Sequence, residues 1–217
     1  MKLEVDSVNL RFGENVVLSD VYAAFEVGQL SSFLGRNGSG KSCLFKIIIG
    51  SIGSQYASVR VDKKYYPSLF KSKLLKYLPQ TYIFPENMKL KMAIKFYEAD
   101  AKKTMHYLEN QGIGMETKFG ELSGGQRRLA EIYVFLNSPS PFVILDEPFT
   151  YLTPIQIEEL KKSLAVYKSE KGIIISDHQY RHVIDVSDKI YLLKSGKTNL
   201  LKSDDVMQQL RDFMYIL

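Results

Sequence analysis

The chain has 217 residues, of which 45% are hydrophobic and 24% are charged, values typical of a globular protein with a substantial core. Its longest apolar runs are strand-sized, well short of the roughly 18 residues that cross a bilayer, so the sequence predicts no membrane-spanning segment. The net charge of +5 is mild, and we attribute it to a solvated surface rather than to contact with anionic lipid headgroups or nucleic acid. The early charges of residues 1–6 argue against a signal peptide, and a single cysteine suits a reducing compartment.

The first 34 residues predict strands. Four short apolar pieces occur at 3–5, 8–10, 16–18 and 21–23. Gly13-Glu14-Asn15 lies between the second and third pieces and predicts a hairpin turn, so we expect an antiparallel sheet here. The run from Leu30 to Leu34 then predicts a short buried strand.

The most informative segment follows that strand. Residues 35–42 read Gly-Arg-Asn-Gly-Ser-Gly-Lys-Ser and fill every fixed position of a G-x-x-x-x-G-K-[ST] loop. Glycines let several backbone N–H groups point at one anion, Lys41 is expected to reach the β- and γ-phosphates, and Ser42 offers a hydroxyl to Mg²⁺. The apolar run after the loop predicts a helix whose N-terminus adds partial positive charge. We therefore expect a nucleotide at Gly35, Arg36, Asn37, Gly38, Ser39, Gly40, Lys41, Ser42 and Cys43.

Beyond this loop the predicted elements change from strands to helices and back. Short strands are expected at 58–61, 65–66 and 75–78. Apolar residues at spacings of three and four then predict helices over 88–97, 99–111 and 121–136. Alternation resumes with strands at 142–145, 173–175 and 190–193, and with helices over 154–167, 179–186 and 204–213. Pro154 opens the first of these helices and Ser203 is expected to cap the last. This order predicts an α/β core interrupted by a helical insertion.

A second motif ends the strand at 142–145. Asp146 and Glu147 follow four apolar residues, as expected for a buried parallel strand whose carboxyl end faces a ligand. Asp146 is expected to hold Mg²⁺ through its water shell, and Glu147, turned elsewhere by the strand pleat, to act as general base toward a water. The pair alone also fits a solvated acidic turn. The phosphate loop earlier in the chain favours nucleotide hydrolysis instead.

A third motif, Leu-Ser-Gly-Gly-Gln at 122–126, precedes a helical run. Ser123 and the free N–H groups of the next residues make a second anion-binding helix start. One nucleotide needs only one such phosphate-binding segment from a subunit. A second segment therefore suggests that it binds the nucleotide of another subunit. By itself the pentapeptide fits an N-cap with a flexible turn equally well.

Together, the segments 35–42, 122–126 and Val-Ile-Leu-Asp-Glu-Pro at 143–148 resemble the nucleotide-binding subunit of an ABC transporter, in order and spacing and over essentially the whole chain. The resemblance implies an α/β fold: a P-loop NTPase three-layer core with an N-terminal antiparallel β subdomain and an inserted α-helical subdomain. It implies that residues 1–80 and 137–217 form the core and that 81–136 form the helical subdomain.

The resemblance also implies the ligands and the assembly. ATP, with Mg²⁺, would lie between the phosphate loop of one copy and a second set of residues from the other copy: Ser123, Gly124, Gly125 and Gln126. The two copies would close head to tail, as a homodimer or as a heterodimer with a second ATP-binding subunit. Transmembrane permease subunits would be separate chains, and this subunit would lie on the cytoplasmic face of the membrane.

Single residues acquire roles from the same resemblance. Phe12 would stack on adenine, although strand packing also explains an aromatic there. Gln80 would contact Mg²⁺ or the attacking water and sense the membrane partner, and His178 would hydrogen-bond the γ-phosphate. The implied catalytic set is Glu147, His178, Lys41 and Gln80, and the implied metal set is Ser42, Gln80 and Asp146.

Three positions depart from the family pattern. Cys43 replaces a threonine, and a thiol is a weaker donor to the α-phosphate. Tyr151 stands where a small residue is usual, and Thr153 replaces an aspartate that contacts the opposite subunit, which puts coupling between the two ATP sites in question. A soluble ATPase of the same family, such as one that assembles iron–sulfur clusters, is the alternative to a transport subunit. The cargo and the direction of transport stay open.

Overall fold

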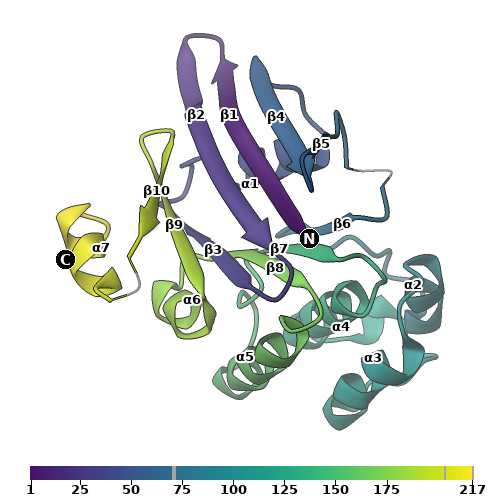
Figure 1. Ribbon diagram of the computed structural model, residues 1–217. Coiled ribbons are helices and arrows are strands. Elements are labelled where there is room, and N and C mark those ends of the chain that lie inside the picture. Colours follow the sequence, from purple (N-terminus) through teal and green to yellow (C-terminus); the bar gives the residue numbers. More distant parts are fainter. Residues whose placement is uncertain (70–71, 203, 217) are drawn as a thin grey trace.

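Two β-sheets and a set of helices make up the computed structural model, which describes residues 1–69, 72–202 and 204–216 (Figure 1). The strands of this described part are β1 (Lys2–Phe12), β2 (Asn15–Glu26), β3 (Leu30–Leu34), β4 (Tyr56–Val61), β5 (Lys64–Tyr65), β6 (Leu75–Leu78), β7 (Phe142–Asp146), β8 (Gly172–Ser176), β9 (Lys189–Lys194) and β10 (Lys197–Leu201). The helices are α1 (Lys41–Ile49), α2 (Leu90–Phe96), α3 (Ala101–Leu108), α4 (Gly124–Leu136), α5 (Pro154–Tyr167), α6 (Tyr180–Val186) and α7 (Val206–Asp212), with short 3₁₀ helices η1 (Glu109–Gln111) and η2 (Phe119–Glu121).

The smaller sheet is antiparallel, with strand order β2-β1-β4-β5. Its hairpin turn confirms the prediction at Gly13, which adopts a φ of +58°. The four apolar pieces predicted before residue 30 belong to only two long strands. Register shifts between Val5 and Val8, with Ser7 at φ +55°, interrupt the alternation and make one strand look like two pieces.

The larger sheet has the order β10-β9-β3-β8-β7-β6, and its four inner pairings, from β9 to β6, are parallel. Successive side chains of β7 point to opposite faces: Phe142 and Ile144 pack with the antiparallel sheet and α1, whereas Val143 and Leu145 pack with the remaining helices. Both faces are therefore covered, which explains why this strand is a continuous apolar run.

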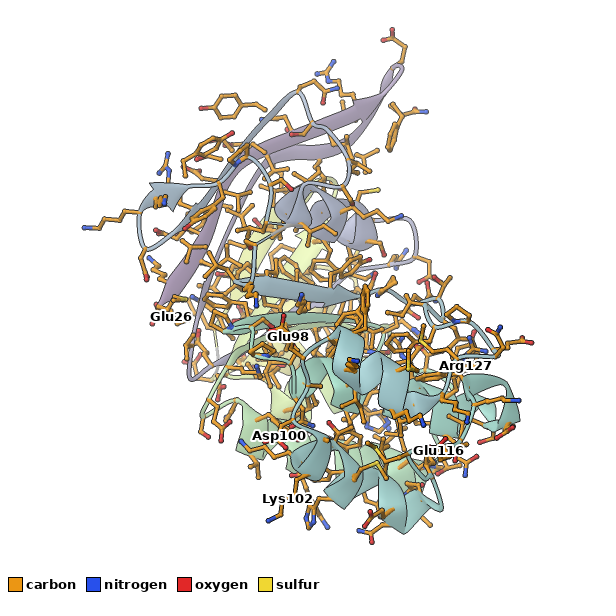
Figure 2. All side chains as sticks on the ribbon, turned by 90° about the vertical axis from the view of Figure 1, so that its right-hand side faces the viewer. Glu26, Glu98, Asp100, Lys102, Glu116 and Arg127 are labelled. Atoms are coloured by element: carbon orange, nitrogen blue, oxygen red, sulfur yellow. The ribbon has the colours of Figure 1, made fainter. Side chains whose placement is uncertain are left out.

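Two clusters of buried apolar side chains, one on each face of the parallel sheet, define three layers (Figure 1). The antiparallel sheet and α1 cover one face of the parallel sheet, and α4, α5 and α6 cover the other. Figure 2, turned by 90°, shows the antiparallel sheet and the segment of α2 and α3 at opposite ends of the molecule. The parallel sheet lies between them, with side chains on both of its faces. The α/β three-layer fold expected from the sequence is confirmed.

The segment between β6 and β7 is helical, as predicted, but its first helices are shorter. Helix α2 ends before Glu98, which adopts a φ of +54°, and Asp100 caps α3 by accepting a hydrogen bond from the Lys103 N–H at 2.9 Å. The predicted 99–111 helix continues after α3 only as the 3₁₀ helix η1. Periodicity alone does not register these chain reversals, so it overestimates helix length.

Two features near the C-terminus differ from the sequence prediction. Strand β10 was not predicted; it pairs with β9 through a turn in which Ser195 and Gly196 both have positive φ. The last helix begins at Val206 rather than 204, and Asp205 caps it by accepting from the Gln208 N–H at 3.3 Å. The predicted cap, Ser203, lies outside the described residues. In the described ranges, no helix combines the length and the apolar character needed to span a membrane.

Candidate nucleotide site

Four parallel strands end at one edge of the larger sheet, and each is followed within two residues by a predicted site residue. Strands β3, β6, β7 and β8 are followed in this way by Gly35, Gln80, Glu147 and His178. Since parallel strands place their carboxyl ends together, segments far apart in the chain meet at this edge. Ligands of open α/β sheets bind at such an edge.

The phosphate loop joins the buried strand β3 to α1. Close packing requires glycine at position 35, because a Cβ there would lie 2.6 Å from Ser39 Oγ and 2.8 Å from the Leu193 carbonyl oxygen. Gly40 precedes α1 with a φ of +102°, a conformation that residues with a Cβ rarely adopt. The loop therefore keeps its backbone accessible at the N-terminus of a nine-residue helix.

Lys41 extends across this loop instead of into solvent. Its Nζ donates to the carbonyl oxygens of Gly35 at 2.6 Å and Arg36 at 3.3 Å. Burial lowers the pKa of Lys41, and the negative charges of Glu147 and Asp146 oppose that shift. The ammonium group is thus partly desolvated and close to two carboxylates, where an anionic ligand would interact with it strongly.

Two predicted catalytic residues converge on a carboxylate oxygen of a third. Glu147 Oε2 accepts from Gln80 Nε2 at 2.9 Å and lies 3.4 Å from His178 Nδ1. The Thr150 hydroxyl donates to the same oxygen at 3.2 Å. The backbone of Glu147, directly after β7, is in the left-handed region, with φ +52°. The structure therefore brings together residues from three separate strand ends.

Asp146 lies deeper, almost fully buried at the end of β7. Its carboxylate accepts from the Tyr77 hydroxyl at 3.0 Å and from the Ser176 hydroxyl. Burial together with the Asp146 charge raises the pKa of Tyr77, so this phenol stays a proton donor. Sequence reasoning missed both hydroxyls, because only the pairing of β6 and β8 with β7 places them beside Asp146.

A cavity of about 540 Å³ unites most of the predicted site. Its lining contains Phe12, the last residue of β1, with 57% of its surface exposed. The other predicted residues in the lining are Asn37, Gly38, Ser39, Gly40, Lys41, Ser42, Cys43, Gln80, Glu147 and His178. An aromatic side chain, a phosphate loop and a carboxylate in one cavity fit a nucleoside triphosphate.

The predicted metal ligands supply oxygen donors beside this cavity. Ser42 and Gln80 line it, and Asp146 ends the adjacent strand. No three His, Cys, Asp or Glu side chains of the described chain cluster into a metal site made by protein alone. Mg²⁺ usually keeps several waters and takes only one or two protein ligands together with phosphate oxygens. The donors present therefore fit Mg²⁺ held jointly with a triphosphate.

The motif at 122–126 lies outside this cavity. Ser123 caps α4: its hydroxyl accepts from the Gln126 N–H at 3.3 Å, and Gln126 Oε1 accepts from the Ser123 N–H at 3.0 Å. Ser123 and Gly124 are exposed, whereas Gly125 packs so closely that a Cβ there would lie 2.8 Å from the Tyr151 carbonyl oxygen. The structure thus presents this helix start to solvent and not to the nucleotide cavity of its own chain.

The departures at Tyr151 and Thr153 have structural consequences next to that motif. Tyr151 adopts a φ of +69° and its exposed ring lies 5.6 Å from the ring of Tyr82. Thr153 caps α5, with its hydroxyl accepting from the Gln156 N–H at 3.4 Å, and Pro154 occupies the first turn. Threonine at this position therefore serves the local start of α5.

Sequence reasoning also missed a buried ion pair on α4. Arg128 and Glu131 are completely buried one helical turn apart, with Arg128 Nη1 3.7 Å from Glu131 Oε2. The sequence offers one indication of this pair: Arg128 borders, and Glu131 interrupts, the apolar run over 129–136 of the same helix. Charged residues are almost never fully buried without partners, so the pair points to a specific role.

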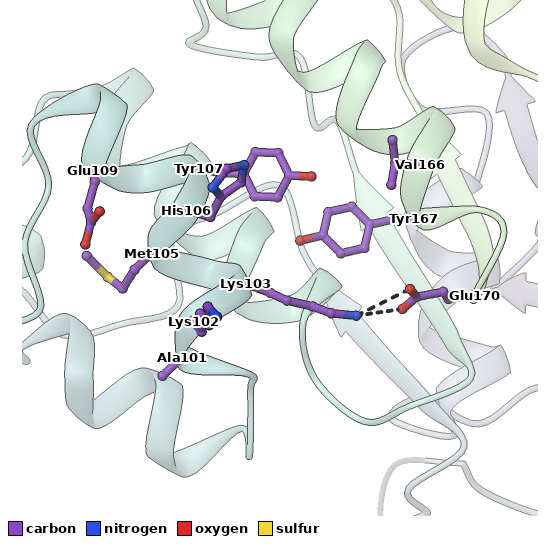
Figure 3. Close-up of a pocket in the computed structure, with 10 residues that line it drawn as sticks. All are labelled: Ala101, Lys102, Lys103, Met105, His106, Tyr107, Glu109, Val166, Tyr167 and Glu170. Carbon is purple, nitrogen blue, oxygen red and sulfur yellow. Dashed lines mark hydrogen bonds and ion pairs between the residues drawn. The ribbon is translucent and has the colours of Figure 1, made fainter.

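A second cavity, of about 690 Å³, lies away from the nucleotide site (Figure 3). It separates α3 from α5 and contains the rings of Tyr107 and Tyr167, with a Lys103–Glu170 ion pair at its rim. Its lining contains neither a phosphate loop nor any residue predicted for the site. The smaller, more polar cavity at the sheet edge is therefore the candidate nucleotide site.

A family model described as ABC transporter matches residues 18–150, more than half of the chain. The chain belongs to the ABC transporter family. Members of this family are ATPases coupled to transport. The match begins in β2 and spans the phosphate loop, the 122–126 motif and the end of β7. The resemblance recognised in these three motifs is confirmed.

Curated ABC proteins resemble the chain over nearly its full length. The lipopolysaccharide export system ATP-binding protein of Haemophilus influenzae is 27% identical over 90% of this chain and 88% of that protein. An uncharacterised ABC transporter ATP-binding protein of Methanocaldococcus jannaschii is 28% identical over 99% and 83%. The chain spans only 38% of a probable ATP-binding/permease protein of H. influenzae, at 26% identity, and 46% of a ribose import ATP-binding protein.

Solved ABC structures share the fold. The ATP-binding subunit of an ABC transporter superposes with a TM-score of 0.84 at 21% identity, covering 99% of this chain and 98% of that chain. A nucleotide-free ATP-binding cassette superposes with a TM-score of 0.84 at 20% identity over the whole of both chains. These likenesses extend the fold to residues outside 18–150, the range that the family model matches.

Proposed function

We propose that this chain binds and hydrolyses ATP and powers an ABC membrane transporter, as a head-to-tail dimer with separate transmembrane subunits. The observation that carries the proposal is the convergence of Gln80 and His178 on the Glu147 carboxylate, at the cavity formed by the phosphate loop. The membership of the ABC transporter family and the transport relatives support it. Because those relatives include both import and export proteins, the proposal leaves the cargo open.

Each site residue has a role in the proposed reaction, ATP + H₂O → ADP + phosphate. Lys41 neutralises charge on the β- and γ-phosphates, and Glu147 accepts the proton of the attacking water. Gln80 and His178, already hydrogen-bonded or close to that carboxylate, orient the water and the γ-phosphate. Ser42, Gln80 and Asp146 would hold Mg²⁺, which supplies further charge neutralisation when bound.

The placement of the 122–126 motif supports the proposed dimer. Ser123 is exposed at the start of α4 and lies outside the cavity of its own chain, so it is available to a second copy. ATP would then lie between Lys41 of one copy and Ser123, Gly124, Gly125 and Gln126 of the other. ATP joins both surfaces, whereas ADP lacks the γ-phosphate, so hydrolysis would loosen the dimer.

The helical segment is the proposed contact with the membrane subunits. We divide the chain into a core, 1–80 and 137–217, and a helical subdomain, 81–136. Helix α2 carries Met92 and Phe96, four residues apart and 51% and 78% exposed. An apolar pair at this spacing on one helix face suits a partner helix. Such a contact would keep the chain at the cytoplasmic face of the membrane.

Two measurements test this proposal. A Glu147→Gln variant, which keeps an oxygen acceptor but cannot take a proton, is expected to sediment as a dimer with ATP and as a monomer with ADP. Purification of the tagged chain from a detergent extract is expected to recover membrane-spanning subunits. Undiminished turnover by the variant would remove Glu147 from the base role. Recovery of soluble partners alone would favour a soluble ATPase of the same family, such as one that assembles iron–sulfur clusters.

A further inference from the structure

The buried charges of α4 contact the two segments that carry the proposed catalytic residues. Arg128 Nη1 donates to the Pro79 carbonyl oxygen at 2.8 Å, directly before Gln80. Its Nη2 donates to the carbonyl oxygen of Glu147 at 3.2 Å and to that of Asp146. One guanidinium therefore links the ends of β6 and β7, and no other donor type offers such a planar fork to several carbonyls.

Glu131 binds the other end of the segment 79–84, which contains Gln80. Its Oε1 accepts from the Ile83 N–H at 2.9 Å and the Phe84 N–H at 3.4 Å. The loop containing Gln80 is thus bound at residue 79 by Arg128 and at residues 83–84 by Glu131. Burial raises the pKa of Glu131 and lowers that of Arg128, and the opposite charge of each partner opposes these shifts.

The backbone of Glu147 needs such support. A non-glycine residue with φ +52° is strained, and strain of this kind persists only where surrounding contacts fix the conformation. Arg128 supplies one of those contacts at the Glu147 carbonyl itself. The Gln80–Glu147 hydrogen bond of 2.9 Å joins the two segments that the ion pair holds.

We propose that Arg128 and Glu131 form a positioning pair for hydrolysis, which fixes Glu147 and Gln80 relative to each other and to the helix that begins after Ser123. This inference rests on the proposed function. Neither side chain reaches the cavity, so the pair acts through the backbone of the residues it holds. Movement of α4 when its exposed start engages a ligand would shift both catalytic residues together.

The test separates positioning from binding. Arg128→Lys keeps the charge but lacks the fork, and Glu131→Gln keeps the shape and an acceptor but lacks the charge. We expect each to lower kcat about 10-fold to 100-fold, as small misplacements of catalytic groups do. ATP affinity at the phosphate loop is expected to change less than about twofold. Lys103→Met, which breaks an exposed ion pair with Glu170, is the control and should retain the wild-type kcat.

A double-mutant cycle supplies the second readout. If Arg128 acts through Glu147, Arg128→Lys in a Glu147→Gln background should lower the residual rate no further. Additive losses, an unchanged kcat in folded variants, or parallel losses of kcat and ATP affinity would overturn the inference. Failure of both Arg128→Lys and Glu131→Gln to fold would make the pair a folding determinant and would overturn it as well. A wild-type chain without ATP turnover would instead refute the proposed function.

Discussion

Replacing Lys41 with methionine isolates the phosphate contact from the rest of the site. Two hydrogen bonds from the ammonium group to phosphate oxygens, which are charged on both sides, contribute about 3 kcal/mol each. The ammonium group must first leave its two carbonyl acceptors, Gly35 and Arg36, at about 2 kcal/mol each, because only the donor is charged there. The net loss on Lys41→Met is therefore about 2 kcal/mol, or roughly 30-fold in ATP affinity.

Titration calorimetry with ATP and Mg²⁺ measures this loss directly. Lys46→Met removes an exposed ammonium from the last turn of the same helix and serves as the matched control, with affinity expected to stay at the wild-type value. Circular dichroism would verify that both variants keep the fold. A Lys41→Met variant that binds ATP within threefold of wild type would refute the assignment of this lysine to the phosphates.

Three other outcomes are expected. Phe12→Ala should weaken ATP binding by about 1 to 3 kcal/mol while leaving inorganic tripolyphosphate binding unchanged, because only ATP carries a base to stack; equal losses for both ligands would exclude stacking. Thr153→Ala should lower the free energy of unfolding, measured in urea, by about 1 kcal/mol. Thr153→Asp, which keeps the α5 cap, should have the wild-type free energy of unfolding. Equal unfolding free energies for the two variants would contradict the capping role of Thr153. Burial lowers the pKa of Lys171 from 10.5 to about 8. The unfolded chain then binds more protons between those values, so the unfolding free energy should rise with pH there by up to about 3 kcal/mol, and Lys171→Met should abolish that rise.

Local motifs made much of the site predictable from the sequence. The phosphate loop is recognised from the spacing of its glycines and Lys41, which fall within eight residues, although Gly35 also packs against the distant Leu193 carbonyl. The start of helix α5 was predicted correctly because Pro154 marks it locally. Where local signals compete, the prediction was less accurate: the bulge near Ser7 divided one strand into two predicted pieces.

The proposed catalytic arrangement depends on contacts that no local pattern encodes. Gln80 and Glu147 are 67 residues apart, yet their side chains bond because β6 and β7 are parallel neighbours. Tyr77 and Ser176 reach Asp146 for the same reason. The family resemblance assigned roles to the residues that occupy motifs, but it did not point to these hydroxyls.

The amino-acid sequence by itself predicted the ligand class, through a glycine-rich loop that is recognisable from its own eight residues. Only the tertiary structure decided which side chains share a carboxylate, which helix start stays exposed, and that Arg128 and Glu131 are buried. The physical reason is that burial and long-range hydrogen bonds arise when strands pair and helices pack. The apolar run of α4 indicates that part of this helix is buried, but only the packed structure shows which of its charged side chains face the core.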